Sequence, residues 1–267
     1  MLERFKLIFN LSRYEFKKEF LGTSLGYFWN LLKPTLTILI YWFVFGHLIK
    51  QDSADPNIPF LLQLISALVP WFFISGAMMS GSGSMLSNVN LVKKVKFSLY
   101  NIPLITLMAN FFNFLIMFAI VIVISCIFGF FPNIYWLQLI YYMLATLLLL
   151  NGFNYIFATL TTLQIDFHQL LGIVLQLLMY LMPILWAMDY VLTKTNGTLL
   201  ATILKINPFF YIITGFRSTI LYPEFNIVNY GLNSISYVAY FWVFVIVINL
   251  IGFLLFRKYK GEFADLL

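Results

Sequence analysis

The chain has 267 residues, of which 62% are hydrophobic and only 10% are charged, and its mean hydropathy is +0.91. Soluble domains carry about 25% charged and about 45–50% apolar residues, so this composition excludes an ordinary soluble enzyme or binding domain. The basic excess, 16 Lys and Arg against 10 Asp and Glu, does not indicate a nucleic-acid partner, because most of the basic residues lie at the two ends of the chain and at 93–96.

Residues 2–20 are predicted to form an amphipathic helix. Polar residues recur at Glu3, Lys6, Asn10, Arg13 and Lys17, three or four positions apart, and phenylalanines supply the opposite face. A helix with Phe on one face and Lys or Arg on the other lies in the membrane interface rather than across it. Packing on a soluble neighbour is the alternative. The following stretch, 22–34, is expected to lead the chain into the membrane.

Six apolar stretches are long enough to cross a bilayer, which takes about 20 residues. They are predicted at 32–49, 59–79, 103–130, 135–163, 169–188 and 235–256. The fold is therefore expected to be all-α and polytopic. We expect one membrane domain over 1–267, with an interface helix and re-entry segment (1–31), six spans (32–256) and a cytoplasmic tail (257–267).

The basic residues predict the orientation. With the N-terminus inside, twelve of them lie on one side, while Lys50, Lys194, Lys205 and Arg217 lie on the other. Because Lys and Arg mark cytoplasmic loops, both termini and the loop 82–102 are expected in the cytoplasm.

The last outer connection, 189–234, is long and largely apolar. A further span is possible on hydropathy, but Lys205, Pro208 and Arg217 interrupt the run. We expect two short helices around Asn207 and Pro208, because proline lacks the backbone N–H and disfavours helix at the residue before it. Irregular backbone at membrane depth must be buried in protein or line a water-filled cavity, so these helices are expected to line a pathway.

No catalytic or metal-binding set is expected. The Gly-rich stretch 81–85 lacks the lysine of a phosphate-binding loop. His47 and His168 are placed on opposite sides of the membrane and cannot share a metal. An acid–base pair of Asp166 with His168 is the alternative to an ordinary polar loop, which we favour. Because no ionisable residue falls at mid-membrane, an ion-coupled carrier or an intramembrane hydrolase is disfavoured.

Aromatic residues are plentiful near and within the spans. Aromatic rings can stack on sugars while their hydroxyl and indole groups reach sugar oxygens. For most of these residues, however, contact with lipid is the favoured interpretation. The pathway candidates are Tyr27, Phe28, Trp29, Tyr41, Trp42, Trp71, Phe72, Phe73 and Tyr155. Five polar residues within spans, Asn110, Asn113, Asn151, Asn154 and Gln176, are expected to face the bundle interior.

An unusually polar insert between two spans is 82–103, with Lys93, Lys94 and Lys96. A polar segment fixed at both ends to membrane helices is suited to transmit the movement of a soluble partner. The chain has no nucleotide-binding motif of its own, so that partner is expected to supply the energy.

Four stretches together resemble the transmembrane subunit of ABC-2-type polysaccharide exporters, the group that handles O-antigen, capsule and teichoic acid. They are FKKEFLGTSLGYFWNLLKPTLTILIYWFVFG (16–46), LVPWFFISGAMMSGSGSMLSNVNLVKKVKF (68–97), QLLMYLMPILWAMD (176–189) and INPFFYIITGFRSTIL (206–221). The chain departs from many relatives after Phe97, where Ser98 and Leu99 stand in place of Pro-Arg.

The resemblance implies a homodimer in a bacterial cytoplasmic membrane, with two copies of a separate ATPase chain that hold ATP and Mg²⁺. No cofactor is implied for this chain. The substrate would be a polysaccharide on undecaprenyl diphosphate, and the Phe-, Ile-, Lys- and Asn-rich composition slightly favours wall teichoic acid over O-antigen or capsule.

The resemblance also implies residue roles. ATPase coupling would involve Met85, Leu86, Asn88, Asn90, Leu91, Lys93, Lys94, Lys96 and Phe97. The helices of 198–222 would form an outer gate with Asn207, Pro208, Phe216 and Arg217. Membrane lipids and the anionic lipid head of the substrate would meet Arg4, Arg13, Lys17, Lys18 and Lys33.

Two alternatives remain at this point. An ABC-2-type drug or lipid exporter would share the topology. A membrane enzyme that modifies polyprenyl-linked glycans would need acidic or histidine residues clustered on one face.

Overall fold

The computed structural model describes residues 2–18, 26, 28–48, 57–93, 98–186, 197–222 and 235–266. Throughout these ranges the chain forms helices and no strand, which confirms the predicted all-α class. The helices are α1 Leu2–Lys18, α2 Phe28–Tyr41, the π-helical η1 Trp42–Leu48, α3 Phe60–Ser82, α4 Ser84–Ser87, α5 Val89–Val92, α6 Asn101–Ile127, the 3₁₀ turn η2 Ile134–Leu137, α7 Gln138–Leu163, α8 Asp166–Leu181, α10 Gly197–Ile206, α11 Pro208–Leu221, α12 Ile235–Tyr259 and α13 Phe263–Leu266.

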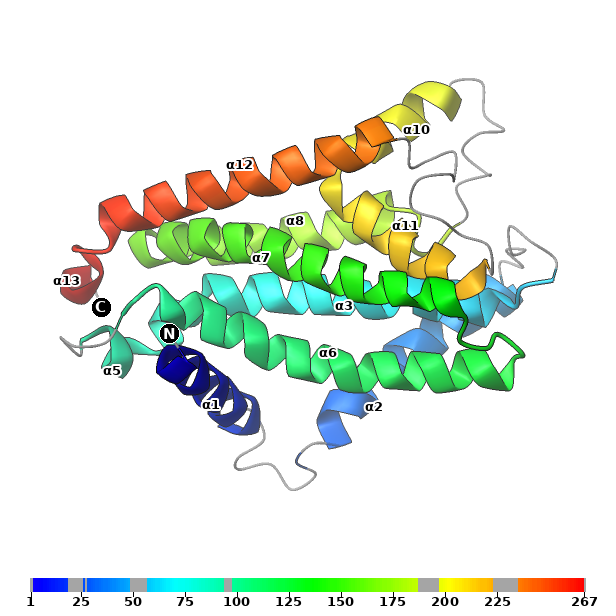
Figure 1. Cartoon of the computed structure of the whole chain (residues 1–267), viewed down its shortest axis with the longest axis horizontal. Coiled ribbons are helices and arrows are strands. Elements are labelled where there is room, and N and C mark those ends of the chain that lie inside the picture. The colour runs from blue at the N-terminus through cyan, green and yellow to red at the C-terminus, as the bar shows by residue number, and fades with distance from the viewer. Residues whose placement is uncertain are drawn as a thin grey trace.

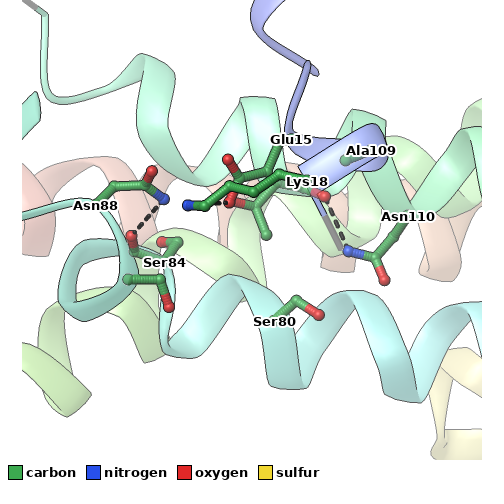
Figure 2. Close-up of a pocket in the computed structure, with 9 residues that line it drawn as sticks. Glu15, Lys18, Ser80, Ser84, Asn88, Ala109 and Asn110 are labelled. Carbon is green, nitrogen blue, oxygen red and sulfur yellow. Dashed lines mark hydrogen bonds and ion pairs between the residues drawn. The ribbon is translucent and has the colours of Figure 1, made fainter. Parts of the chain in front are cut away.

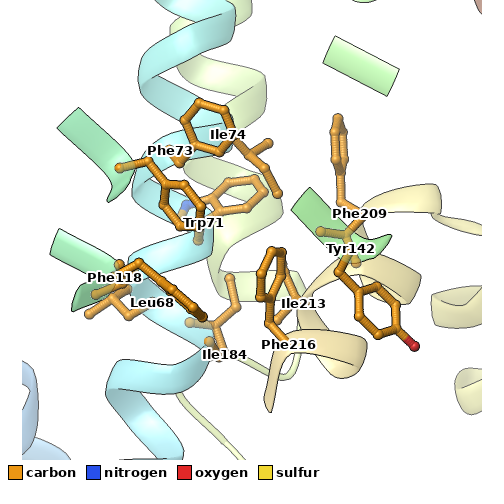
Figure 3. Packing of buried hydrophobic residues seen from close by; sticks show 14 of the residues in the cluster. Leu68, Trp71, Phe73, Ile74, Phe118, Tyr142, Ile184, Phe209, Ile213 and Phe216 are labelled. Carbon is orange, nitrogen blue, oxygen red and sulfur yellow. The ribbon is translucent and has the colours of Figure 1, made fainter. Parts of the chain in front are cut away.

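Helix α3 is the centre of the bundle and packs against α6, α7, α8 and α11 (Figure 1). In the most apolar stretch of α3, 72% of the residues are buried, whereas in that of α12 only 17% are buried. Figure 3 shows how Leu68 and Trp71 of α3 meet Phe118 of α6 and Phe216 of α11 in the core. A helix that is apolar on all sides can be covered on all sides, and α3 is such a helix.

Within the described residues, the number of candidate spans is five or six. Five helical stretches are long and apolar enough to cross a membrane, namely Leu31–Leu48, Phe60–Ser82, Asn101–Ile127, Ile134–Leu163 and Ser236–Tyr259. The bent pair of α10 and α11 would make a sixth if it counts as one span.

The predicted fifth span, 169–188, is corrected by the structure. Helix α8 has 16 residues and ends at Leu181, and Met182 adopts an extended conformation with ψ 152. The cause is Pro183, which disfavours helix at the residue before it. At 1.5 Å per residue, α8 reaches about 24 Å, which is shorter than the hydrocarbon core of about 30 Å.

Helices α7 and α12 pack closely against each other, and glycines allow the approach. A Cβ on Gly152 would lie 2.9 Å from the backbone nitrogen of Asn249. Asn151 Nδ2 donates to Asn249 Oδ1 at 3.0 Å, and Asn249 Nδ2 donates to the Leu148 carbonyl at 2.8 Å. Small residues and amide side chains at such a contact are typical of membrane helix pairs.

The first and last described helices, α1 and α13, lie at the same end of the bundle together with α4 and α5, whereas the bend between α10 and α11 lies toward the opposite end (Figure 1). We call these the terminal end and the elbow end. The candidate functional features gather at these two ends.

Candidate functional site

The connecting segment, residues 84–93, joins α3 to the lead into α6 through the two single-turn helices α4 and α5. Asn88 separates them: its φ of −124° is not helical, and its Nδ2 donates to the Ser84 carbonyl at 3.1 Å. Met85 and Val92 are buried on the inner side, while Asn90 and Lys93 are exposed. The segment therefore has an anchored face and a free polar face.

The residues predicted for ATPase coupling are divided between these faces. Leu86, Asn88 and Leu91 are half-buried between the buried Met85 and the exposed Asn90 and Lys93. Lys94, Lys96 and Phe97 lie outside the described residues.

A small hydrophobic cluster, which we call the terminal cluster, holds the inner face of the connecting segment. It is made of Met85, Val92, Ile102, Ala158, Phe256 and Phe263. The rings of Phe256 and Phe263 meet edge-on at 5.2 Å. Tyr155, one of the predicted pathway aromatics, packs against this cluster and donates to the Tyr100 carbonyl at 3.1 Å.

Phe263 is the important residue that sequence reasoning missed. The sequence of 257–267 predicts a charged tail. In the structure, however, α13 packs beside α5, and its Phe263 is 0% exposed. The sequence signal that could have indicated this burial is a phenylalanine among charged and small residues after the last span. The end of the chain thereby supports the connecting segment.

The end of α3 is also joined to α8. Ser82 Oγ and His168 Nδ1 are 2.6 Å apart. Asp166 instead accepts a long contact from Gln164 at 3.4 Å. His168 therefore links two helices, and the alternative acid–base pair with Asp166 is not formed.

A polar cleft lies between α1, the connecting segment and α6 (Figure 2). One lobe has a volume of about 340 Å³ and is lined by Ser80, Ser84, Ser87, Asn88, Thr106, Ala109 and Asn110, with Glu15 and Lys18. A second lobe of about 320 Å³ shares Glu15, Lys18, Ser87 and Asn88 and continues along Leu11, Tyr14, Asn90, Leu91, Ile102 and Ile105. Lys18 Nζ and Glu15 Oε1 form an ion pair at 3.7 Å.

Helix α1 packs against α6 through one face. The rings of Phe9 and Phe16 lie edge-on to Phe112 at 5.5 and 6.3 Å. Ser12 is fully covered at this contact, which lets the two backbones approach. Arg13 and Lys17 are exposed on the remaining surface.

The other residues predicted to meet lipid heads are placed as follows. Lys18 lies at the cleft, and Lys33 of α2 is exposed with its Nζ 5.9 Å from the Trp29 ring. The side chain of Arg4 is outside the described part of the chain. Lys33 therefore belongs to a different element from the basic residues of α1.

The elbow between α10 and α11 confirms the two short helices predicted around Asn207 and Pro208. Their axes differ by 97°. Asn207 has an extended ψ of 120°, and its Oδ1 accepts from Phe209 N at 3.0 Å, so that it caps α11 while Pro208 occupies the first turn. Tyr237 and Tyr240 of α12 each donate to a carbonyl at the end of α10, at 2.7 Å.

Arg217 ties three elements together. Its Nε donates to the Gln63 carbonyl of α3 at 3.2 Å, and its Nη2 donates to the Ile184 carbonyl after α8 at 2.9 Å. The neighbouring Phe216 is fully buried against Phe118, with ring centroids 5.4 Å apart. The predicted gate residues thus divide into a capping pair and an anchored pair.

The predicted pathway aromatics fall into separate groups. Trp71 and Phe73 are buried in the core, and Trp71 meets Phe209 edge-on at 6.2 Å. Phe28 and Trp29 of α2 are exposed. Tyr41, Trp42 and Phe72 are half-buried, and Tyr27 lies outside the described residues.

Polar residues within the helices mostly face inward, as predicted. Asn154 is 1% exposed and lies against Gly81, where a Cβ would collide with its amide. Asn110, Asn113 and Asn151 are half-buried. Gln176 is exposed on α8, so the prediction that it faces the interior of the bundle is wrong for the single chain. The polar side chain points outward because Leu171 and Leu175 form the buried face of α8.

Comparison with known proteins gives a consistent set of similarities. The family model described as ABC-2 type transporter matches residues 6–221. Two proteins of Klebsiella pneumoniae named O-antigen export system permease protein RfbA are 26% and 25% identical to this chain over 264 residues, covering 98% of it and 95% of each relative. A protein of the same name from Myxococcus xanthus is 24% identical over 212 residues, 79% of each chain.

Proposed function

The chain belongs to the ABC-2 type transporter family, and from that premise we propose that it is the membrane subunit of an ATP-driven polysaccharide exporter. The observation that carries the proposal is the alignment with O-antigen export permeases over nearly the full length of both chains. The apolar multi-helix bundle and the connecting segment with a free polar face support it.

The proposed cargo is a polysaccharide of O-antigen type carried on undecaprenyl diphosphate. The names of the three relatives support this class. Wall teichoic acid, which the composition slightly favours, ranks second because none of these three relatives carries that name.

The proposed assembly is a homodimer with two ATPase chains, which hold ATP and Mg²⁺. The terminal end faces the cytoplasm, and the ATPase pushes on the free face of the connecting segment at Asn90 and Lys93. Met85 and Val92 pass the movement to the terminal cluster. Since α3 ends at this segment and the lead into α6 follows it, the tilt of both helices follows its displacement.

The proposed path runs from the basic surface of α1 to the elbow end. Arg13 and Lys17 attract the anionic lipid head at the cytoplasmic face. The exposed aromatics Phe28 and Trp29 contact the cargo, whereas Trp71 and Phe73 stiffen the wall behind the path because they are buried. The elbow of α10 and α11 forms the outer gate.

Removal of the chain from its cells tests the proposal. We expect surface polysaccharide to be lost and the lipid-linked polymer to accumulate inside, with recovery on re-expression of the chain. Unchanged surface polysaccharide together with altered resistance to drugs would instead support a drug exporter, the other activity that the topology allows.

A further inference from the structure

We propose that the cleft between α1 and the connecting segment binds a sugar unit of the cargo, and that its occupancy is communicated to the connecting segment. The proposal rests on the proposed function, since it takes the cargo to be a glycan. It concerns a site that is separate from the exposed aromatics of α2 and from the elbow.

The polar lobe offers hydrogen-bonding groups that the described residues leave unused. Asn88 and Asn110 each donate through Nδ2 to a backbone carbonyl, at 3.1 and 2.9 Å, and their amide oxygens have no donor within the described part of the chain. The hydroxyls of Ser80 and Ser87 are exposed and likewise have no partner among the described residues. Ser84 Oγ, at the inner wall, is buried and unpaired there. A polyhydroxylated ring, which donates and accepts at several positions, satisfies such a set.

The charge of the cleft favours a neutral sugar over a phosphate. Among the described residues that line it, the two charged ones, Glu15 and Lys18, form an ion pair with each other. A phosphate would meet the carboxylate of Glu15 and would find one lysine already neutralised, whereas phosphate sites hold an excess of cations or backbone N–H groups. The exposed Arg13 and Lys17 lie outside this lining and remain available to the lipid head.

The second lobe suits the apolar face of a sugar ring. Leu11, Leu91 and Ile105 line it, and Tyr14, a residue 60% exposed, lies beside them. An aromatic ring next to hydroxyl and amide groups combines stacking with hydrogen bonding. The two lobes, about 340 and 320 Å³, are within the usual range for small-molecule sites.

The cleft can report its occupancy because its two walls belong to different elements. One wall is α1, which is held by Phe112 of α6. The opposite wall is the connecting segment itself, through Ser84, Ser87 and Asn88. Figure 2 shows Glu15 and Lys18 on one side and Ser84 and Asn88 on the other. A sugar that bridges them fixes the position of the segment on which the ATPase acts.

Photo-crosslinking tests the occupancy directly. The full chain, co-expressed with its ATPase partner in cells that make the glycan, carries benzoylphenylalanine at Ser80 or, as control, at Ile116 on the exposed side of α6. We expect an adduct that stains for carbohydrate after periodate oxidation from position 80 and none from position 116. An adduct at position 80 that contains only phospholipid or protein, or no adduct, overturns the proposal.

A second measurement uses paired substitutions on the same two helices. Ser80→Ala with Asn110→Leu removes polar groups from the cleft, whereas Ser75→Ala with Asn113→Leu makes the same changes outside it. The probe is the lipid-linked glycan extracted from cells that lack the chain, and the readout is ATPase activity of the reconstituted complex. Loss of two neutral hydrogen bonds should raise the half-saturating glycan concentration about fivefold or more in the first pair and leave it unchanged in the second.

Equal half-saturation in the two pairs overturns the cleft proposal. The proposed function is judged separately, by whether cells without the chain lose surface polysaccharide. If they do and the pairs are equal, only the cleft proposal fails.

Discussion

Arg217 shows how a single cation at the elbow end is stabilised without an acidic partner among the described residues. Its guanidinium group donates to carbonyls of α3 and of the turn after α8. Arginine suits this role because its donors point in two fixed directions. Arg217, which the sequence predicted to line an outer gate, connects α11 with α3 and with the turn after α8.

Substitution of Arg217 by alanine should destabilise the bundle. Hydrogen bonds from a charged donor are worth about 1.5–3 kcal/mol each, so for the two bonds we expect a loss of about 3–6 kcal/mol and a lower melting temperature of the purified chain. Lys205→Ala removes a charge from the neighbouring helix without removing the backbone carbonyl that Tyr237 contacts, and should have little effect. An Arg217→Ala chain that melts like the wild type would disprove the tie.

At the scale of elements, the connecting segment depends on α13. Met85 and Val92 are short-range anchors, but Phe263 comes from the far end of the sequence. Helices α4 and α5 are single turns, and isolated helices shorter than about 12 residues are not stable in water. They therefore depend on the packing that the Phe263 ring provides. In the proposed mechanism, the segment transmits the push of the ATPase only while the terminal cluster holds it.

Phe263→Ala should release the connecting segment. Removing a buried phenylalanine costs about 3–5 kcal/mol, and here the loss should appear as faster hydrogen exchange over 84–93 and as reduced export at normal insertion. Leu266→Ala, on the exposed side of α13, is the matched control. Equal exchange rates in the two variants would show that α13 does not support the segment.

The contact between α7 and α12 should be intolerant of added volume. A Cβ at Gly152 would lie 2.6 Å from Ile248 Cγ2, whereas one at Gly172 would make an ordinary contact of 3.6 Å with Met79 Cε. We expect Gly152→Ala to cost about 1–3 kcal/mol and Gly172→Ala to cost much less, as measured by thermal unfolding in detergent. Similar unfolding temperatures for both variants would contradict the close approach.

At the scale of the whole molecule, hydropathy and proline positions predict most of the architecture. The spans near 59–79, 103–130, 135–163 and 235–256 agree closely with α3, α6, η2–α7 and α12, and the elbow falls at Asn207 and Pro208. The early end of α8 could have been predicted from Pro183. Hydropathy missed it because the apolar run continues past the proline.

The arrangement around the site was less predictable from the sequence. Trp71 and Trp29 are both tryptophans in or beside apolar runs, yet one is 2% and the other 39% exposed. Lipid and protein interior are both apolar, so composition does not distinguish them. The cleft and the terminal cluster join residues far apart in the chain, such as Glu15 with Asn110 and Met85 with Phe263, and no local pattern encodes such pairs.

The most direct test of the account is ATP-dependent movement of the proposed lipid-linked glycan across the membrane of proteoliposomes that contain this chain and the proposed ATPase partner. The account predicts movement with ATP, and its loss in the chain with Lys93→Glu and Lys94→Glu while the complex stays assembled and inserted. Assembled wild-type complex that hydrolyses ATP without moving the glycan, or a variant that moves it at the wild-type rate, would contradict the account.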